Sequence, residues 1–323
     1  MKDYAITADK KKILIAGLDN AGKTSIIDLV QNKMVNTLSM NPTKGVSRRE
    51  AEILGQSFIL HDLGGQEQYR HIYLSQANKY FLETGACVFV VDLQDRVRYK
   101  VALGYFESIL KLFKGLRLSP RVYVFFHKFD DTYKAEYNDP AKPVREEYNQ
   151  LRDKFINAAR LSSFSVYEFY KTSIFDEWSC YAAFFDIWSS FITRLDSIQS
   201  YLEHISEVVP GVLLSLLLDE NGNLLGKHFA KDMQVAADKL IDLATAAIKA
   251  LAEFKRTRMG ASLGETNLVT AKVGNRVVRI REFDANGKAY YLAIARETSD
   301  DDALKSALDQ IAYSMSVFMV TNA

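Results

Sequence analysis

Residues 17 to 24, Gly-Leu-Asp-Asn-Ala-Gly-Lys-Thr, have the composition and spacing of a loop that wraps around a phosphate group. Glycines let the backbone turn tightly and bring its N–H groups close to a β-phosphate. Lys23 can reach the β- and γ-phosphates, and the Thr24 hydroxyl is a suitable Mg²⁺ ligand. An apolar run at 13–16 precedes the loop and a helical pattern at 25–30 follows it, as such a loop requires. The sequence therefore predicts binding of a nucleoside phosphate, with contacts from Asp19, Asn20, Ala21, Gly22, Lys23, Thr24 and Ser25.

A second cluster, Asp62-Leu63-Gly64-Gly65-Gln66, follows a strand pattern at 57–61. A carboxylate at the end of an apolar strand downstream of a phosphate loop commonly provides a further Mg²⁺ contact, and Asp62 is predicted in that role. Gly65 can bring its N–H against a γ-phosphate because no side chain blocks the approach. Gln66 stands next to it and can orient an attacking water, which predicts hydrolysis of the nucleotide.

A third cluster, His127-Lys128-Phe129-Asp130, follows the apolar strand pattern at 121–126 and is predicted to select the base. The Asp130 carboxylate can accept hydrogen bonds from N1–H and the exocyclic amine of guanine, whereas adenine offers no matching pair of donors. The stem of Lys128 can lie over the plane of the base. The predicted ligand is therefore GTP or GDP.

Ser173 and Ile174 follow the last alternating stretch, 164–170, and their backbone amides are expected to meet guanine O6. Ligands of an open parallel sheet bind beyond the carboxyl ends of its strands. All of the motifs above stand at such ends, so they are expected to converge on one crevice.

The elements that carry these motifs alternate between strand and helix, which predicts a mostly parallel six-stranded sheet in an α/β domain over residues 1–195. A polar stretch, 33–47, is expected to be a surface loop, and 131–148 a charged, Pro-containing insertion. The expected strands are 13–16, 48–54, 57–61, 87–92, 121–126 and 164–170, and the expected helices are 25–30, 101–113, a helix ending near 160, and an aromatic-rich helix ending near 195.

Residues 196–323 have a different pattern, which predicts an α+β domain with a five-stranded antiparallel sheet. Asn-Gly at 221–222, between apolar runs, is a strong hairpin signal. We find no paired carboxylates, metal ligands or nucleophile in this half, and Arg276, Arg279 and Arg281 are expected to form a solvated strand face. The expected elements are helix 198–208, strands 212–218 and 223–229, helix 231–255, strands 266–273, 276–283 and 288–295, and helix 301–320.

The composition is that of a globular protein, with 48% hydrophobic and 25% charged residues among 323. A net charge of +1 disfavours nucleic acid or an anionic membrane as a partner. Cys87 and Cys180 stand in apolar surroundings and are expected to be buried free thiols. No apolar run approaches the about 20 residues that span a bilayer. We expect a cytoplasmic protein without direct membrane insertion, recruited to membranes only through partners.

With these motifs in this order, the chain resembles small GTPases of the Ras superfamily. The phosphate loop, Pro42-Thr43-x-Gly45 and Asp62-x-Gly64-Gly65-Gln66 look like the Arf branch. His127, in the place of the usual asparagine, and residues 172–177, which lead into a Trp-containing helix, look like the Rag branch. Rag-type GTPases also carry a C-terminal roadblock domain, which the predicted elements of 196–323 resemble.

The resemblance implies further roles. Thr43 would be the switch threonine, whose hydroxyl meets Mg²⁺ and whose amide meets the γ-phosphate, and it would join Lys23 and Gln66 in the catalytic set. The Mg²⁺ ligands would be Thr24, Thr43 and Asp62. The implied partners are a GTPase-activating protein, an exchange factor, effectors, and a second subunit, identical or different, bound through the roadblock-like domain.

Two functions remain as hypotheses: a GTP-hydrolysing switch with a slow intrinsic rate, and a scaffold that holds nucleotide constitutively with negligible hydrolysis. Intact Lys23, Thr24, Thr43, Asp62 and Gln66 favour the switch. No arginine in the sequence is evidently placed to act on the phosphates in cis, although Arg48, Arg49 and Arg70 stand near the predicted switch loops.

Overall fold

The computed structural model describes residues 10–31, 45–230, 246–247, 250, 268–273, 276–296 and 301–321. The chain divides into two compact units: the first holds Met1–Leu29 and Lys33–Cys180, and the second holds Val30–Asn32 and Tyr181–Ala323, so the main boundary is at Cys180. This boundary lies inside α7 (Glu177–Ser189). The division that the sequence predicts, between residues 195 and 196, falls inside the next helix and stays a prediction.

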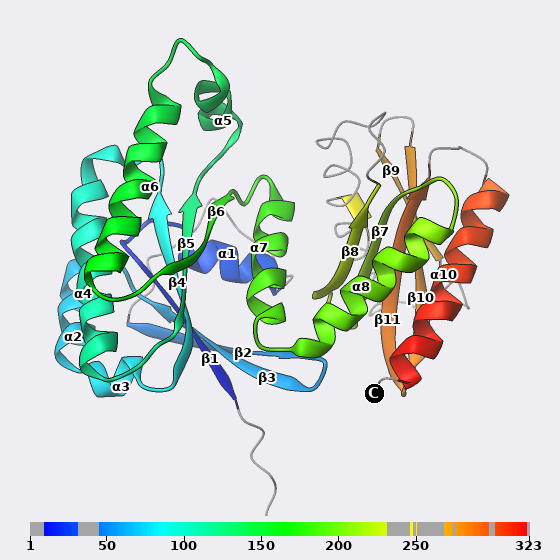
Figure 1. Cartoon of the computed structure of the whole chain (residues 1–323), viewed down its shortest axis with the longest axis horizontal. Helices are drawn as coiled ribbons and strands as arrows, with labels where there is room; N and C mark the ends of the chain where they lie inside the picture. The colour runs from blue at the N-terminus through cyan, green and yellow to red at the C-terminus, as the bar shows by residue number, and fades with distance from the viewer. Residues whose placement is uncertain are drawn as a thin grey trace, which may run out of the picture. The chain divides into compact units, whose positions relative to one another are not determined.

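The first unit contains a six-stranded sheet of order β2-β3-β1-β4-β5-β6 (Figure 1). The pair β2–β3 is antiparallel and the other neighbouring pairs are parallel, which confirms the predicted mostly parallel sheet. The strands are β1 (Lys11–Gly17), β2 (Val46–Ile53), β3 (Gln56–Leu63), β4 (Thr84–Asp92), β5 (Arg121–His127) and β6 (Val166–Thr172).

Helices connect these strands and build the core against them. The central strands β4 and β5 are buried almost throughout, as their continuous apolar runs predict. Phe106 packs between Phe89 and Phe155, with ring centroids 5.1 and 5.0 Å away. The helices are α1 (Lys23–Val30), α2 (Glu67–Ser75), α3 (Ala77–Phe81), the 3₁₀ helix η1 (Arg96–Arg98), α4 (Tyr99–Gly115), α5 (Asp131–Asn138) and α6 (Val144–Leu161).

Three helices of the first unit, α2, α3 and α5, have no counterpart among the predicted elements. The insertion at 131–148 contains α5, whose eight residues end shortly before Pro140. A helix of this length shows too few apolar repeats to be recognised by periodicity.

The helical region around residue 190 also differs from the prediction. The aromatic helix does not reach residue 195: α7 ends at Ser189, and α8 (Thr193–Val208) begins after a three-residue connection, 190–192. Leu195 is buried in the first turn of α8, so the predicted start at 198 is too late. All of the residues of α7 are buried or half-buried, so the helix has no exposed polar face to mark where it ends.

The second unit contains a five-stranded antiparallel sheet of order β8-β7-β11-β10-β9, which confirms the predicted α+β class. α8 and α10 (Asp301–Thr321) lie side by side on one face of this sheet (Figure 1), and the rings of Tyr201 and Phe318 stack with centroids 4.1 Å apart. Asn286 and Gly287 both have positive φ, which suits the two-residue turn between β10 and β11. The strands are β7 (Val212–Asp219), β8 (Leu224–Phe229), β9 (Leu268–Val273), β10 (Arg276–Ala285) and β11 (Lys288–Arg296).

Some predictions concern residues outside the described ranges. These are positions 33–44 of the polar loop, positions 266–267 of the predicted strand, and helix 231–255 except Ala246, Ala247 and Ala250, which are helical. Cys87 and Cys180 are free and buried as predicted, and burial raises the pKa of each thiol to about 12. Within the described ranges, no helix has the length and apolar character needed to cross a bilayer.

Candidate functional site

The predicted phosphate loop connects the carboxyl end of β1 to the start of α1. Gly17 has φ +148°, and a Cβ atom there would lie 2.3 Å from the Val90 carbonyl oxygen on β4. Asn20 and Gly22 also have positive φ, at 60° and 88°. The tight turn therefore depends on glycine at 17, where the neighbouring strand leaves no room for a side chain.

Lys23 points its ammonium group into this loop. Its side chain is 5% exposed, and Nζ donates hydrogen bonds to the carbonyl oxygens of Leu18 at 2.7 Å and Gly17 at 3.2 Å. Burial lowers the pKa of Lys23 to about 8, while the nearby carboxylates of Asp62 and Asp19 act in the opposite direction. The group is mostly charged at neutral pH, and an anion in the loop would further stabilise its charged form.

Thr24 and Asp62 meet at the side of the loop. Thr24 Oγ1 donates a hydrogen bond to Asp62 Oδ2 at 2.6 Å, and Asp62 is fully buried at the end of β3. The described residues contain no group of three or more His, Cys, Asp or Glu side chains suited to a metal. These two adjacent oxygens fit a cation such as Mg²⁺, which prefers oxygen ligands and takes its others from phosphates and water.

Gly65 lies directly on the phosphate loop. A Cβ atom on Gly65 would come within 2.1 Å of the Asp19 nitrogen and the Leu18 carbonyl carbon, so only glycine fits this contact. The preceding amide, Gly64 N–H, donates to the Gly45 carbonyl at 2.9 Å, and the Tyr73 hydroxyl donates to the same oxygen at 2.7 Å. The segment after β3 is thus fixed both to the loop and to the start of β2.

Gln66 stands at the N-terminus of α2, immediately after Gly65. Its carbonyl accepts hydrogen bonds from the amides of Tyr69 and Arg70, both at 3.0 Å, and its side-chain oxygen accepts one from Gln68 at 3.2 Å. The sequence places Gln66 correctly beside the loop, but its water-orienting role stays a prediction. Thr43, the third predicted catalytic residue, lies outside the described residues.

His127 ends β5 and connects the segment predicted to recognise the base to the predicted phosphate loop. Its ring is 2% exposed, and Nδ1 lies 2.9 Å from Thr172 Oγ1 on β6. A Cβ atom on Gly22 would lie 2.4 Å from His127 Cδ2, so the imidazole packs against that glycine. Burial, reinforced by the charge of Lys128, lowers the pKa of His127 to about 3, and the ring is neutral at physiological pH.

Asp130 and its neighbours form the opposite end of the site. Asp130 Oδ2 accepts a hydrogen bond from Gln94 Nε2 at 3.0 Å, and Oδ1 accepts one from the Ser173 hydroxyl. Lys128 has φ +62° and donates to Asp92 Oδ2 at 2.5 Å. The carboxylate and the lysine therefore lie together beyond β5, as the sequence predicts.

The predicted guanine O6 contacts follow β6. In this structure the Ser173 amide donates to Ser179 Oγ at 3.0 Å, so a base oxygen would have to replace that contact. Ile174 follows and is half-buried. The hydroxyl of Ser173, which the sequence did not single out, supports Asp130 instead.

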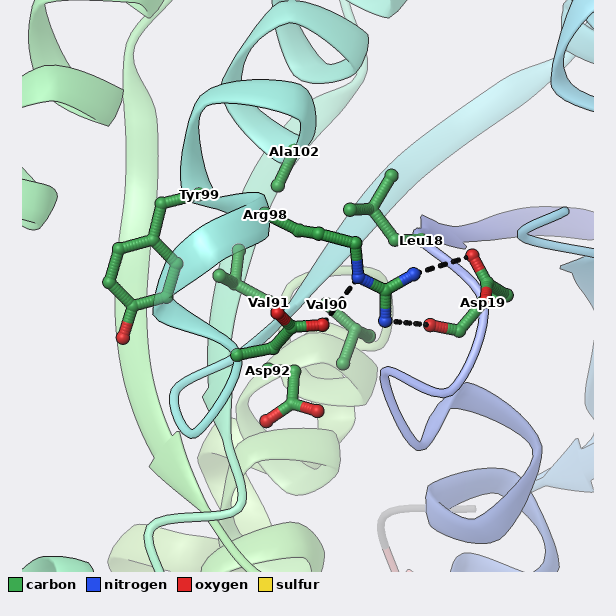
Figure 2. A pocket seen from close by; sticks show the side chains of 9 residues that line it. Leu18, Asp19, Val90, Val91, Asp92, Arg98, Tyr99 and Ala102 are labelled. Carbon is green, nitrogen blue, oxygen red and sulfur yellow. Dashed lines mark hydrogen bonds and ion pairs between the residues drawn. The ribbon is translucent and has the colours of Figure 1, made fainter. Parts of the chain in front are cut away.

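Three residues of the site were not predicted from the sequence: Asp92 at the end of β4, and Gln94 and Arg98 between β4 and α4. Figure 2 shows the Arg98 guanidinium against the phosphate-loop residue Asp19. The same guanidinium also pairs with Asp95. Asp92 ends an apolar strand as Asp62 does, and that position was an available signal. Nothing local to the sequence distinguishes Arg98 from its neighbour Arg96.

The fold and the arrangement of these motifs define a small GTPase of the Rag/Arf-like type. Residues 12–237 match the Gtr1/RagA G protein conserved region, and the chain belongs to that family.

Individual relatives match about a third of the chain. It is 36% identical over 99 residues to ADP-ribosylation factor-like protein alp41 of Schizosaccharomyces pombe, a match that covers 31% of this chain and 50% of that protein. It is 41% identical over 90 residues to human ADP-ribosylation factor-like protein 5A, covering 28% and 47%. The chain spans about half the length of these curated relatives.

Among solved structures, the chain is similar to the Arl6 BBS3 small GTPase from Trypanosoma brucei with the bound nucleotide analogue GppNp. The match covers 47% of this chain and 98% of that chain, with 23% identity and a TM-score of 0.32.

Proposed function

We propose that this protein binds GTP and GDP with Mg²⁺, hydrolyses GTP slowly, and acts as a molecular switch. One observation carries the proposal: two oxygen ligands suited to Mg²⁺, on Thr24 and Asp62, lie 2.6 Å apart beside the buried ammonium of Lys23. A carboxylate suited to guanine, on Asp130, stands beyond β5 in the same sheet.

The residues around the phosphates would each have a separate role. The loop amides from Asp19 to Ser25 would surround the phosphates, with Lys23 opposite the β- and γ-phosphates. Gly65 would offer its N–H to the γ-phosphate, and Gln66 would orient the attacking water. Mg²⁺, held by Thr24, Asp62 and Thr43, would neutralise phosphate charge when bound.

Base selection belongs to the other end of the site. Asp130 would accept two hydrogen bonds from guanine in place of those that it now accepts from Gln94 and Ser173. The stem of Lys128 would cover the base, and the amides of Ser173 and Ile174 would meet O6. His127 would act indirectly, because its ring supports the phosphate loop at Gly22.

Switching would depend on the γ-phosphate, which would order residues 33–47 and 64–73 through Thr43 and Gly65. Partners would recognise that difference: an exchange factor, a GTPase-activating protein and effectors. The second unit would serve as a roadblock-like dimerisation domain that pairs with an identical or a related chain. We place the protein in the cytoplasm, with membrane recruitment through partners.

Equilibrium binding of a fluorescent GDP tests the site. We expect binding that weakens when Mg²⁺ is chelated and is lost in Lys23→Ala, because the buried cation would no longer face the phosphates. Lys111→Ala, an exposed lysine on α4, is the matched control and should bind like the parent chain. Retained micromolar affinity in Lys23→Ala would contradict the assignment of this loop.

Light scattering of the full chain tests the second unit. A dimer in both nucleotide states supports pairing through that unit. A monomer in both states would mean that the chain does not pair with itself, and would leave a different roadblock-bearing chain as the proposed partner.

A further inference from the structure

Arg98 connects the phosphate loop to the turn that follows β4 (Figure 2). Nη1 donates a hydrogen bond to Asp19 Oδ1 at 2.9 Å, and Nη2 reaches the Asp19 carbonyl at 3.3 Å. The third nitrogen, Nε, donates to the Asp95 carboxylate. Arg98 ends η1 and precedes α4, so the start of a long helix fixes its backbone. One side chain thus holds a loop residue 79 positions away in the sequence.

The Asp19 backbone lies next to the residue that is proposed to meet the γ-phosphate. A Cβ atom on that residue, Gly65, would come within 2.1 Å of the Asp19 nitrogen. The charges of Asp19 and Arg98 both reach the Lys23 ammonium, since the first raises and the second lowers its pKa. An unneutralised carboxylate at this position would repel the additional negative charge of a triphosphate.

We propose that Arg98 holds and neutralises the Asp19 carboxylate, and that this ion pair sets how well the site accepts GTP relative to GDP. Arg98 is a positioning residue in this account, because it acts on the nucleotide through Asp19. The inference rests on the proposed nucleotide site and adds a determinant of its selectivity.

A direct contact between Arg98 and a phosphate is the competing explanation. It would require the guanidinium to break at least one of the three hydrogen bonds that it donates to Asp19 and Asp95. The two explanations differ in what the removal of Asp19 should do. If Arg98 only neutralises the carboxylate, removing the carboxylate makes Arg98 dispensable.

The test compares dissociation constants for GDP and for the slowly hydrolysed analogue GTPγS, measured on the full chain with Mg²⁺. We expect Arg98→Ala to weaken GTPγS about tenfold and GDP less than about twofold, because GDP lacks the repelled phosphate. The double variant Asp19→Asn/Arg98→Ala should return the GTPγS value to within about twofold of the parent chain.

Arg96→Ala is the matched control, since it removes the same charge from the same 3₁₀ helix. Arg96 pairs with Glu147 at 3.1 Å, on α6, and should leave the GTPγS-to-GDP ratio unchanged. Asp19→Asn alone provides a second readout that does not depend on the folding of Arg98→Ala. It should bind GTPγS at least as tightly as the parent chain does.

The outcomes separate the inference from the proposed function. A parent chain that binds both nucleotides, with an unchanged ratio in Arg98→Ala, would overturn the inference and leave the nucleotide site standing. A double variant as weak as Arg98→Ala, or an Asp19→Asn variant that loses GTPγS affinity, would also overturn it and assign the residues to direct phosphate contact. A parent chain that binds neither nucleotide would overturn both proposals.

Discussion

The imidazole of His127 packs against Gly22 so closely that a Cβ atom on that glycine would lie 2.4 Å from Cδ2 and 2.6 Å from Nε2 of the ring. This contact joins the segment proposed to read the base to the loop proposed to hold the phosphates. Because Nδ1 of the same ring lies 2.9 Å from Thr172 Oγ1, the ring cannot move away without losing that partner. The two ends of the site are therefore mechanically connected through a neutral, buried histidine.

Gly22→Ala should damage the site from the phosphate side. The substitution adds a methyl group at φ +88° and forces it onto His127, so we expect nucleotide affinity to fall at least about tenfold. Fluorescent GDP binding measures the loss. Gly104→Ala is the control, because Gly104 is helical and a Cβ there meets no atom within 4 Å. Equal affinity in the two variants would show that the contact does not matter.

His127 should make stability depend on pH. Its pKa is about 3 in the folded protein and about 6.5 in the unfolded chain. Between these two pH values His127 is protonated in the unfolded chain and neutral in the folded protein. The contribution of His127 to the free energy of unfolding is therefore fully present above about pH 6.5. It declines by about 1.4 kcal/mol per pH unit as the pH falls toward 3. His61, with its pKa lowered to about 4 by burial, acts in the same direction.

The measurement is urea unfolding at pH 7 and pH 5. Between these values His127→Asn should lose about 2 kcal/mol less of its free energy of unfolding than the parent chain loses. The difference in slope is informative even if the variant is less stable at both values. Identical pH dependence in the two proteins would mean that His127 does not remain neutral in the fold.

Asp130→Asn should change which base is bound. An asparagine amide donates where guanine also donates, so guanine affinity should fall at least about a hundredfold. Xanthine carries a carbonyl at that position and should bind more tightly than guanine to the variant. Asp131→Asn, the exposed neighbour in the first turn of α5, should keep the guanine preference. Unaltered preference in Asp130→Asn would remove this residue from base recognition.

Much of this site was predictable because its chemistry is encoded in short segments. The turn glycines, Lys23 and Thr24 follow one another, and their spacing alone predicts the loop. Asp62 and Asp130 each stand at the end of an apolar strand, and the rule for parallel sheets brings such ends together. The antiparallel sheet of the second unit was predictable for the same reason, since its turns carry Asn and Gly.

What the sequence did not predict depends on contacts between distant segments. Arg98 reaches the phosphate loop only because α4 packs beside β1 in the folded chain. The spacing of residues around Arg98 in the sequence does not predict that contact. The hydrogen bond from the Ser173 amide to Ser179 Oγ depends on where α7 begins. The boundary between α7 and α8 was misplaced because α7 has no exposed face whose polar pattern would mark its end.

Single-turnover hydrolysis of GTP by the full chain tests the central claim most directly. The account predicts slow hydrolysis by the parent chain. Gln66→Leu should still bind GTP but hydrolyse it at a rate at least about tenfold lower, whereas Gln76→Leu should hydrolyse GTP at the parent rate. Gln76, exposed at the C-terminal end of the same helix, undergoes the same change of side chain. Tight GTP binding without hydrolysis in the parent chain would instead indicate a scaffold, and equal rates in the parent and Gln66→Leu would contradict the proposed role of Gln66.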